Sequence, residues 1–168
     1  QDNTLKLLFV GPPKLEKGFH SLYYAIKELI DEIDLNITIK VVRAGELTLP
    51  AEEIEYIKAY PDIFIFTGYV SDISELKSHY RDADIFVLPT YHEGFPRVLY
   101  EAMVFGLPII TSDIDMLQPP MKHGVNCLLA NPKCHDSIKM RLQQYLNDEQ
   151  LRTETGKCAQ TYVKKLFN

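Results

Sequence analysis

The residues best suited to chemistry lie in the segment 91–111, where Glu93 and Glu101 stand eight positions apart. A short apolar run at 85–89 predicts a buried strand, and Pro96 suits the first position of a helix because a proline there gives up no intrahelical hydrogen bond. Glu93 therefore lies where a strand ends. Ligands of open parallel sheets bind beyond such ends, where loops and helix N-termini bring unpaired backbone N–H groups together. The loop around Glu93 is a candidate ligand site.

Glu101 falls on a helix whose other positions are apolar around nearly the whole circumference. The pattern predicts a buried helix on which Arg97 and Glu101 share one narrow polar sector. An ion pair between them is favoured on the residues alone, although such pairs stabilise a helix by only about 0.2–0.5 kcal/mol. The alternative partner is a ligand diol, because the two oxygens of a carboxylate can accept both hydroxyl protons of a ribose.

Length and composition limit the class of protein. A chain of 168 residues can build one core, and its formal net charge of −5 offers no basic field to a nucleic acid. Its three cysteines, Cys127, Cys134 and Cys158, lack the paired spacings of a zinc site and indicate reduced thiols. No apolar stretch reaches the ~20 residues that span a bilayer, and the first residues lack the apolar core of a signal peptide. We expect a cytoplasmic protein, or a piece of one.

Apolar runs and helical patterns alternate along the chain. Six runs predict strands, at 5–10, 37–42, 63–66, 85–89, 108–111 and 127–130. Helical patterns lie between them, at 19–30, 51–60, 72–80 and 96–105, and again from about 136 to the end. Asp72 with Glu75 resembles a capping box for the third helix. Because parallel strands are joined by right-handed crossovers, we expect one doubly wound, Rossmann-like α/β domain with about six parallel strands and helices on both faces.

Several short motifs together resemble one enzyme family. They are Phe9-Val10-Gly11, Lys17-Gly18, Phe66-Thr67-Gly68-Tyr69-Val70, Ala83-Asp84-Ile85-Phe86-Val87-Leu88-Pro89, Glu93-Gly94-Phe95-Pro96, Glu101-Ala102-Met103 and Gly106-Leu107-Pro108-Ile109-Ile110. The set covers almost the whole chain and resembles the nucleotide-sugar-binding half of retaining glycosyltransferases of family 4, the group 1 type. The resemblance implies the two-domain GT-B architecture. Residues 1–168 would be its C-terminal, donor-binding half, and the N-terminal acceptor domain would lie outside this chain.

The resemblance also implies roles for the site residues. Glu93 would be the catalytic carboxylate beside the donor sugar, and Glu101 would hold the ribose of a nucleoside diphosphate. The implied donor-binding residues are Gly11, Lys14, Lys17, Gly94, Phe95, Pro96, Arg97 and Glu101. No metal or other cofactor is expected, and the donor would be a UDP- or GDP-linked sugar. Family acceptors are often lipid-linked, so the full-length protein could touch the inner face of a membrane peripherally.

This chain departs from the family pattern in two loops. The family has an arginine after the first glycine, whereas Pro12 stands there. Proline supplies neither a cation nor an N–H, so either Lys14 takes over or phosphate binding is weaker; substitution by Lys14 is favoured. In the second loop, Asp115-Met116 and Pro119 replace the usual glycine pair and glutamate, which leaves contacts to the donor sugar open.

The combined interpretation is a hexosyltransferase of polysaccharide biosynthesis that retains anomeric configuration and that needs its other domain for turnover. One alternative is a non-catalytic sugar-nucleotide-binding or interaction module whose phosphate loop has degenerated at Pro12. A second, a phosphoryl-accepting receiver domain, would need acidic residues after the first strand, where Gly11-Pro12-Pro13 supplies none. The base and sugar of the donor, the acceptor, the linkage and the oligomeric state stay open.

Overall fold

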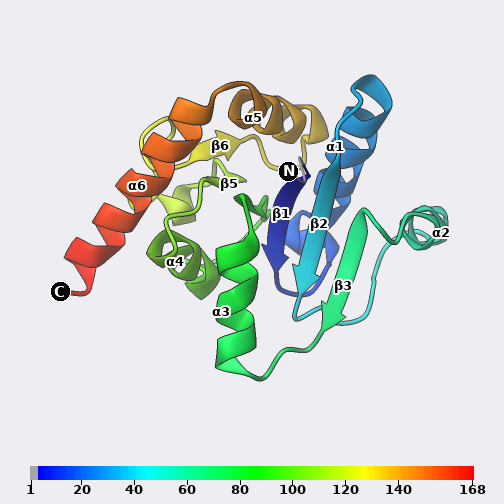
Figure 1. Ribbon diagram of the computed structural model, residues 1–168, viewed down its shortest axis with the longest axis horizontal. Coiled ribbons are helices and arrows are strands. Elements are labelled where there is room, and N and C mark those ends of the chain that lie inside the picture. The colour runs from blue at the N-terminus through cyan, green and yellow to red at the C-terminus, as the bar shows by residue number, and fades with distance from the viewer. Residues whose placement is uncertain (1–3) are drawn as a thin grey trace.

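The computed structural model describes residues 4–168 and contains one parallel sheet in the order β3-β2-β1-β4-β5-β6 (Figure 1). Its strands are β1 (Leu5–Val10), β2 (Ile37–Val42), β3 (Phe64–Gly68), β4 (Ile85–Leu88), β5 (Ile109–Ser112) and β6 (Leu128–Ala130). The chain adds β2 and β3 on one side of β1, then returns to add β4, β5 and β6 on the other. The predicted doubly wound sheet is confirmed, and its direction of growth reverses between β1 and β4.

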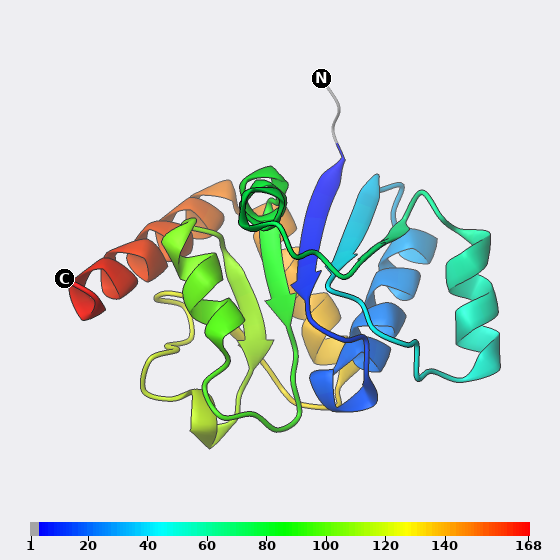
Figure 2. The same cartoon turned by 90° about the horizontal axis from the view of Figure 1, so that it is seen from below.

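Helices cover both faces of the sheet. They are α1 (Phe19–Glu32), α2 (Ala51–Ala59), α3 (Ile73–Asp82), α4 (Arg97–Val104), α5 (His135–Asn147) and α6 (Glu149–Leu166), with short 3₁₀ turns η1 (Leu15–Lys17) and η2 (Asp115–Leu117). Figures 1 and 2 show α1 and α5 side by side on one face, with α3 and α4 on the other. Helix α6 leaves the end of α5 and packs against α4.

Aromatic contacts hold the two helical layers to the sheet. Phe9 of β1 meets Phe19 of α1 edge to face, with ring centroids 5.3 Å apart. On the other face, Phe86 of β4 stacks with Tyr80 of α3 at 6.0 Å. All four residues of β4 are buried, as strands covered on both faces require.

Three predictions about helices need correction. The helical pattern after residue 136 forms two helices, because Asp148 interrupts it and its carboxylate accepts a hydrogen bond from the Leu151 N–H at 2.8 Å. Helix α4 is buried on one side only, since Val104 is 52% exposed. Pro96 is the N-cap residue of α4, one position before the helix begins. Asp72 is the N-cap of α3 and accepts from the Ser74 N–H at 2.9 Å, whereas the Glu75 carboxylate, expected to complete a capping box, lies 3.8 Å from His79 Nε2.

The helices of the described chain, residues 4–168, include none with the length and apolar character needed to cross a membrane.

Candidate functional site

Two loops meet where the growth of the sheet reverses, one following β1 and one following β4. The carbonyl of Glu16 accepts hydrogen bonds from the Tyr91 N–H at 2.8 Å and from the Thr90 hydroxyl at 3.2 Å. Gly18 packs so closely that an added Cβ would lie 1.8 Å from the carbonyl oxygen of Pro89. The two loops are therefore fixed against each other at the crevice where open sheets bind ligands.

The central charges of this crevice are Lys17 and Glu93, which form an ion pair between the two loops. Lys17 is 30% exposed and Glu93 15% exposed, so both charges are partly shielded from water. Burial lowers the pKa of the Lys17 ammonium, an effect that Glu16 opposes and the positive charge of Lys14 reinforces. The structure thus brings together two residues that are 76 positions apart and that sequence reasoning placed in one site.

Glu101 has a partner that the sequence did not indicate. The phenol of Tyr80, on α3, donates a hydrogen bond to Glu101 Oε2 at 2.6 Å. Burial raises the pKa of Tyr80, and the hydrogen bond to Glu101 raises it further, so the phenol stays a neutral donor. Within residues 4–168 no ion pair joins Glu101 to Arg97, which is exposed, and the favoured salt-bridge interpretation was wrong.

The loop after β1 carries the residues expected to bind phosphate. Gly11 has φ 139°, a conformation that favours glycine, and donates its N–H to the Val42 carbonyl at 2.9 Å. Lys14 is exposed and lies close enough to Lys17 for its charge to lower the pKa of that ammonium. The geometry is compatible with Lys14 taking the place of the arginine that Pro12 displaces.

The segment before α4 lies at the same end of the sheet. Gly94 and Arg97 are exposed, and Pro96 provides no side-chain cap for the helix. The Phe95 ring packs on Tyr100 with centroids 4.4 Å apart, which fixes the loop while leaving its backbone at the surface. No described backbone hydrogen bond uses the N–H groups of Gly94 and Phe95, so these donors are free to meet a ligand.

Arg43 is a candidate that sequence reasoning missed. It follows β2 with φ 59°, a left-handed conformation that is uncommon away from glycine. Its positive charge acts on Tyr80, opposing the effects that raise the pKa of that phenol. Arg43 therefore lies near the Tyr80–Glu101 pair. It follows the carboxyl end of β2, as Lys17 follows that of the parallel strand β1. The sequence feature that could have indicated this residue is an arginine directly after the second predicted strand.

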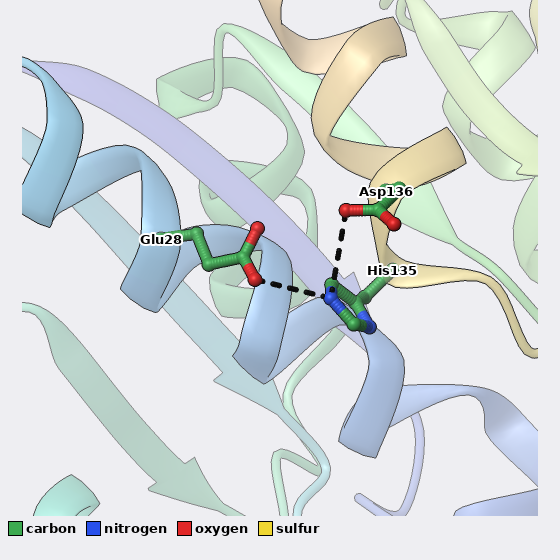
Figure 3. A group of neighbouring side chains, drawn as sticks. All are labelled: Glu28, His135 and Asp136. Atoms are coloured by element: carbon green, nitrogen blue, oxygen red, sulfur yellow. Dashed lines mark hydrogen bonds and ion pairs between the residues drawn. The ribbon is translucent and has the colours of Figure 1, made fainter.

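A second group of polar residues joins α1 to the start of α5 (Figure 3). The Nε2 atom of His135 lies 3.1 Å from Glu28 Oε1 and 3.6 Å from Asp136 Oδ1. One ligand atom from each of these residues lies within 4.8 Å of the others, a spacing that could hold a metal ion. Lys139 Nζ is 2.8 Å from Glu28 Oε2 and already neutralises that carboxylate. Glu28 and His135 are 107 positions apart in the sequence, so no local pattern indicated that they would meet.

The family model described as "Glycosyl transferases group 1" matches residues 1–162. The chain belongs to this family. An uncharacterized glycosyltransferase of Methanocaldococcus jannaschii is 30% identical over 148 residues, which cover 88% of this chain and 37% of that protein. The capsular polysaccharide biosynthesis glycosyltransferase CapM of Staphylococcus aureus is 24% identical over 162 residues, covering 95% of this chain and 41% of CapM. This chain therefore spans about two fifths of the length of these relatives.

Two solved structures share the fold. The C-terminal domain of LpcC from Francisella tularensis superposes with a TM-score of 0.84 at 22% identity, covering 97% of this chain and 85% of that domain. Anabaena HepE, solved with UDP and glucose, gives a TM-score of 0.79 at 21% identity, covering 99% of this chain and 45% of HepE. The expected fold, a Rossmann-like domain that matches the C-terminal domain of a GT-B enzyme, is confirmed.

Proposed function

We propose that this chain is the donor-binding domain of a retaining hexosyltransferase of family 4. It would transfer the sugar of a nucleoside-diphosphate sugar to a glycan or lipid-linked acceptor. The observation that carries the proposal is the meeting of Lys17 and Glu93 at the reversal point of the sheet, with Glu101 on the helix that follows. HepE, which has the same fold, has been solved with UDP-glucose.

The proposed donor lies across the crevice from Glu101 to Glu93. Tyr80 occupies Glu101 Oε2, while Glu101 Oε1 makes no hydrogen bond to another described residue and can accept from a ribose hydroxyl. Lys17, with Lys14 beside it, supplies positive charge for the diphosphate. The backbone N–H groups of Gly94 and Phe95 add hydrogen-bond donors at the start of α4.

Electrostatic stabilisation would supply most of the catalysis. Departure of the nucleoside diphosphate leaves an oxocarbenium-like sugar and places charge on the leaving phosphate oxygens. Lys17 and the free backbone N–H groups would stabilise that charge as it develops, and Glu93 would hold the donor sugar. This scheme needs no metal and no nucleophile from these residues.

The acceptor domain and part of the catalytic machinery would belong to a longer chain, as in relatives that this sequence covers only in part. On this proposal residues 1–168 bind donor and barely turn it over alone. We place the full-length protein in the cytoplasm, with peripheral contact at the inner face of the membrane where a lipid-linked acceptor requires it.

Calorimetric titration of the chain with UDP and GDP tests the proposal. We expect saturable heat with one of the two at or below millimolar concentration, and competition by the matching nucleotide sugar. The alternative, a non-catalytic module, is favoured by Pro12, which removes a cation from the phosphate loop. Absence of heat and of chemical-shift change with either nucleotide would contradict the donor site.

A further inference from the structure

Arg43 is the first residue after β2, and it lies beside the loop that follows β1. The N–H of Gly11, the first residue of that loop, donates to the carbonyl of Val42, the last residue of β2, at 2.9 Å. The two loops stay close beyond this bond, because a Cβ added to Gly45 would lie 3.8 Å from Pro12 Cβ. Arg43 is therefore a neighbour of the loop that is expected to face phosphate.

The backbone of Arg43 is strained. Its φ of 59° lies in the left-handed region, which Lys133, at 61°, is the one other non-glycine residue of the described chain to adopt. Side chains raise the energy of this conformation, and residues held in it cluster at functional sites. A glycine at position 43 would form the same turn without strain. The chain thus carries an arginine where the backbone alone favours glycine.

The guanidinium of Arg43 is exposed and unpaired. Among residues 4–168, no carboxylate forms an ion pair with it and no oxygen accepts a hydrogen bond from it. Lys17 differs, since its ammonium is already paired with Glu93. An anion that meets Arg43 therefore has no carboxylate to displace.

Electrostatic effects place Arg43 at one end of the crevice. Burial and the hydrogen bond to Glu101 raise the pKa of Tyr80, and the positive charge of Arg43 opposes them. The pKa of Lys17 is lowered first by burial, and the cation that lowers it further is Lys14. Arg43 therefore belongs to the end of the crevice that holds Glu101, and Lys14 to the end that holds Lys17.

A nucleoside diphosphate has one phosphate bonded to the ribose and a second that carries the sugar. Glu101 is the proposed ribose ligand, and the nearby Gly11-Pro12-Pro13 stretch supplies no cation and no N–H from its prolines. A guanidinium matches a phosphate with two parallel N–H donors. We propose that Arg43 binds the ribose-side phosphate in this way and is the cation that the proline loop lacks. This role rests on the proposed function.

Calorimetric titration of the chain tests this role, with the nucleoside diphosphate that it binds, UDP or GDP, and the matching monophosphate. Arg43→Gly should weaken both ligands about tenfold, because each contains the ribose-side phosphate and loses a charge-assisted hydrogen bond. Lys17→Met should weaken the diphosphate by a larger factor than the monophosphate. Arg43→Lys keeps the charge without the paired donors, so its affinities should lie between those of the parent and Arg43→Gly.

Lys133→Gly is the matched control. It also removes an exposed cation and replaces a left-handed residue by glycine, and it should bind both ligands as the parent does. Both glycine variants should melt at or above the temperature of the parent, because glycine adopts this conformation without strain. Weaker binding without a lower melting temperature separates a ligand contact from a structural role.

The remaining outcomes are distinguishable. If the parent bound neither UDP nor GDP, the proposed function would be contradicted, and the role of Arg43 with it. Nucleotide binding by the parent with equal affinities for Arg43→Gly and Lys133→Gly would overturn the role of Arg43 alone. A loss confined to the diphosphate would move Arg43 to the second phosphate. Weaker binding by an Arg43→Gly variant that melts below Lys133→Gly would make the residue structural; either result overturns the assignment.

Discussion

At the scale of single residues, the Lys17–Glu93 ion pair has a consequence for ligand binding. A diphosphate that uses Lys17 must draw the ammonium away from a carboxylate that is already bound to it. Glu93 therefore opposes nucleotide binding twice, by holding Lys17 and by repelling the phosphates. In a partly buried site both effects exceed those of a surface pair.

This leads to opposite expectations for the two members of the pair. Glu93→Gln should bind UDP about fivefold more tightly, because Lys17 is released, corresponding to ~1 kcal/mol. Lys17→Met should weaken binding by about 10- to 100-fold, the loss of a charge-assisted hydrogen bond. Calorimetric titration of both variants, with Lys122→Ala, at an exposed lysine, as control, measures these changes. Weaker binding by Glu93→Gln would show that the carboxylate supports the nucleotide directly.

The oxygen of Glu101 that Tyr80 does not occupy leads to a prediction about ribose binding. If its free oxygen accepts a ribose hydroxyl proton, the parent protein should bind UDP more tightly than 2′-deoxy-UDP, and Glu101→Ala should weaken UDP binding by about 1–3 kcal/mol. The same variant should also lose the preference between the two nucleotides. Competition titrations give both affinities. If Glu101→Ala still bound UDP more tightly than 2′-deoxy-UDP, another residue would contact the ribose hydroxyl, even if the variant bound both nucleotides more weakly.

At the scale of elements, the loops after β1 and β4 depend on Gly18. An alanine there would place its Cβ 1.8 Å from Pro89 O, at φ 76°. Gly18→Ala should therefore destabilise the fold by roughly 1–3 kcal/mol and weaken UDP binding, because Lys17 moves with its loop. Urea unfolding measures the midpoint, and calorimetry the affinity.

Gly45→Ala is the matched control for that substitution. The nearest atom to its Cβ is 3.8 Å away, an ordinary contact, so stability and UDP binding should both stay close to those of the parent. If Gly18→Ala and Gly45→Ala unfolded at the same urea concentration, the close packing of the two loops would contribute little to stability. If they also bound UDP equally, it would contribute little to UDP binding.

The sequence predicted the elements better than it predicted their contacts. The strands lie within one or two residues of the apolar runs because fully buried strands are continuously apolar. The break at Asp148 was missed because the polar helical pattern continues through it, although an aspartate at that position can cap a helix. The Glu101 partner was missed because Tyr80 comes from another helix, and local spacing carries no information about that approach.

At the scale of the whole molecule, the strand order explains why the expected site residues meet. Its expected residues follow β1 and β4, which are neighbours only because the growth of the sheet reverses between them. In a doubly wound sheet with the order β3-β2-β1-β4-β5-β6 these two loops lie together, so the observed strand order brings Lys17 and Glu93, which the family resemblance indicated, to one crevice. The Glu28–His135 contact depends instead on how α1 packs against α5, which no strand order determines.

The same arrangement predicts that nucleotide binding does not need a divalent metal. Lys14, Lys17 and Arg43 approach the crevice from the loops after β1 and β2, and the α4 N-terminus adds its dipole, so the protein itself can neutralise the diphosphate. The residues that could hold a metal, Glu28 with His135 and Asp136, lie between α1 and α5, and an ion there would not bridge the phosphates. UDP affinity measured by calorimetry should therefore be the same in EDTA as in magnesium or manganese. A tenfold loss in EDTA, restored by either metal, would mean that an ion shares the diphosphate with Lys17.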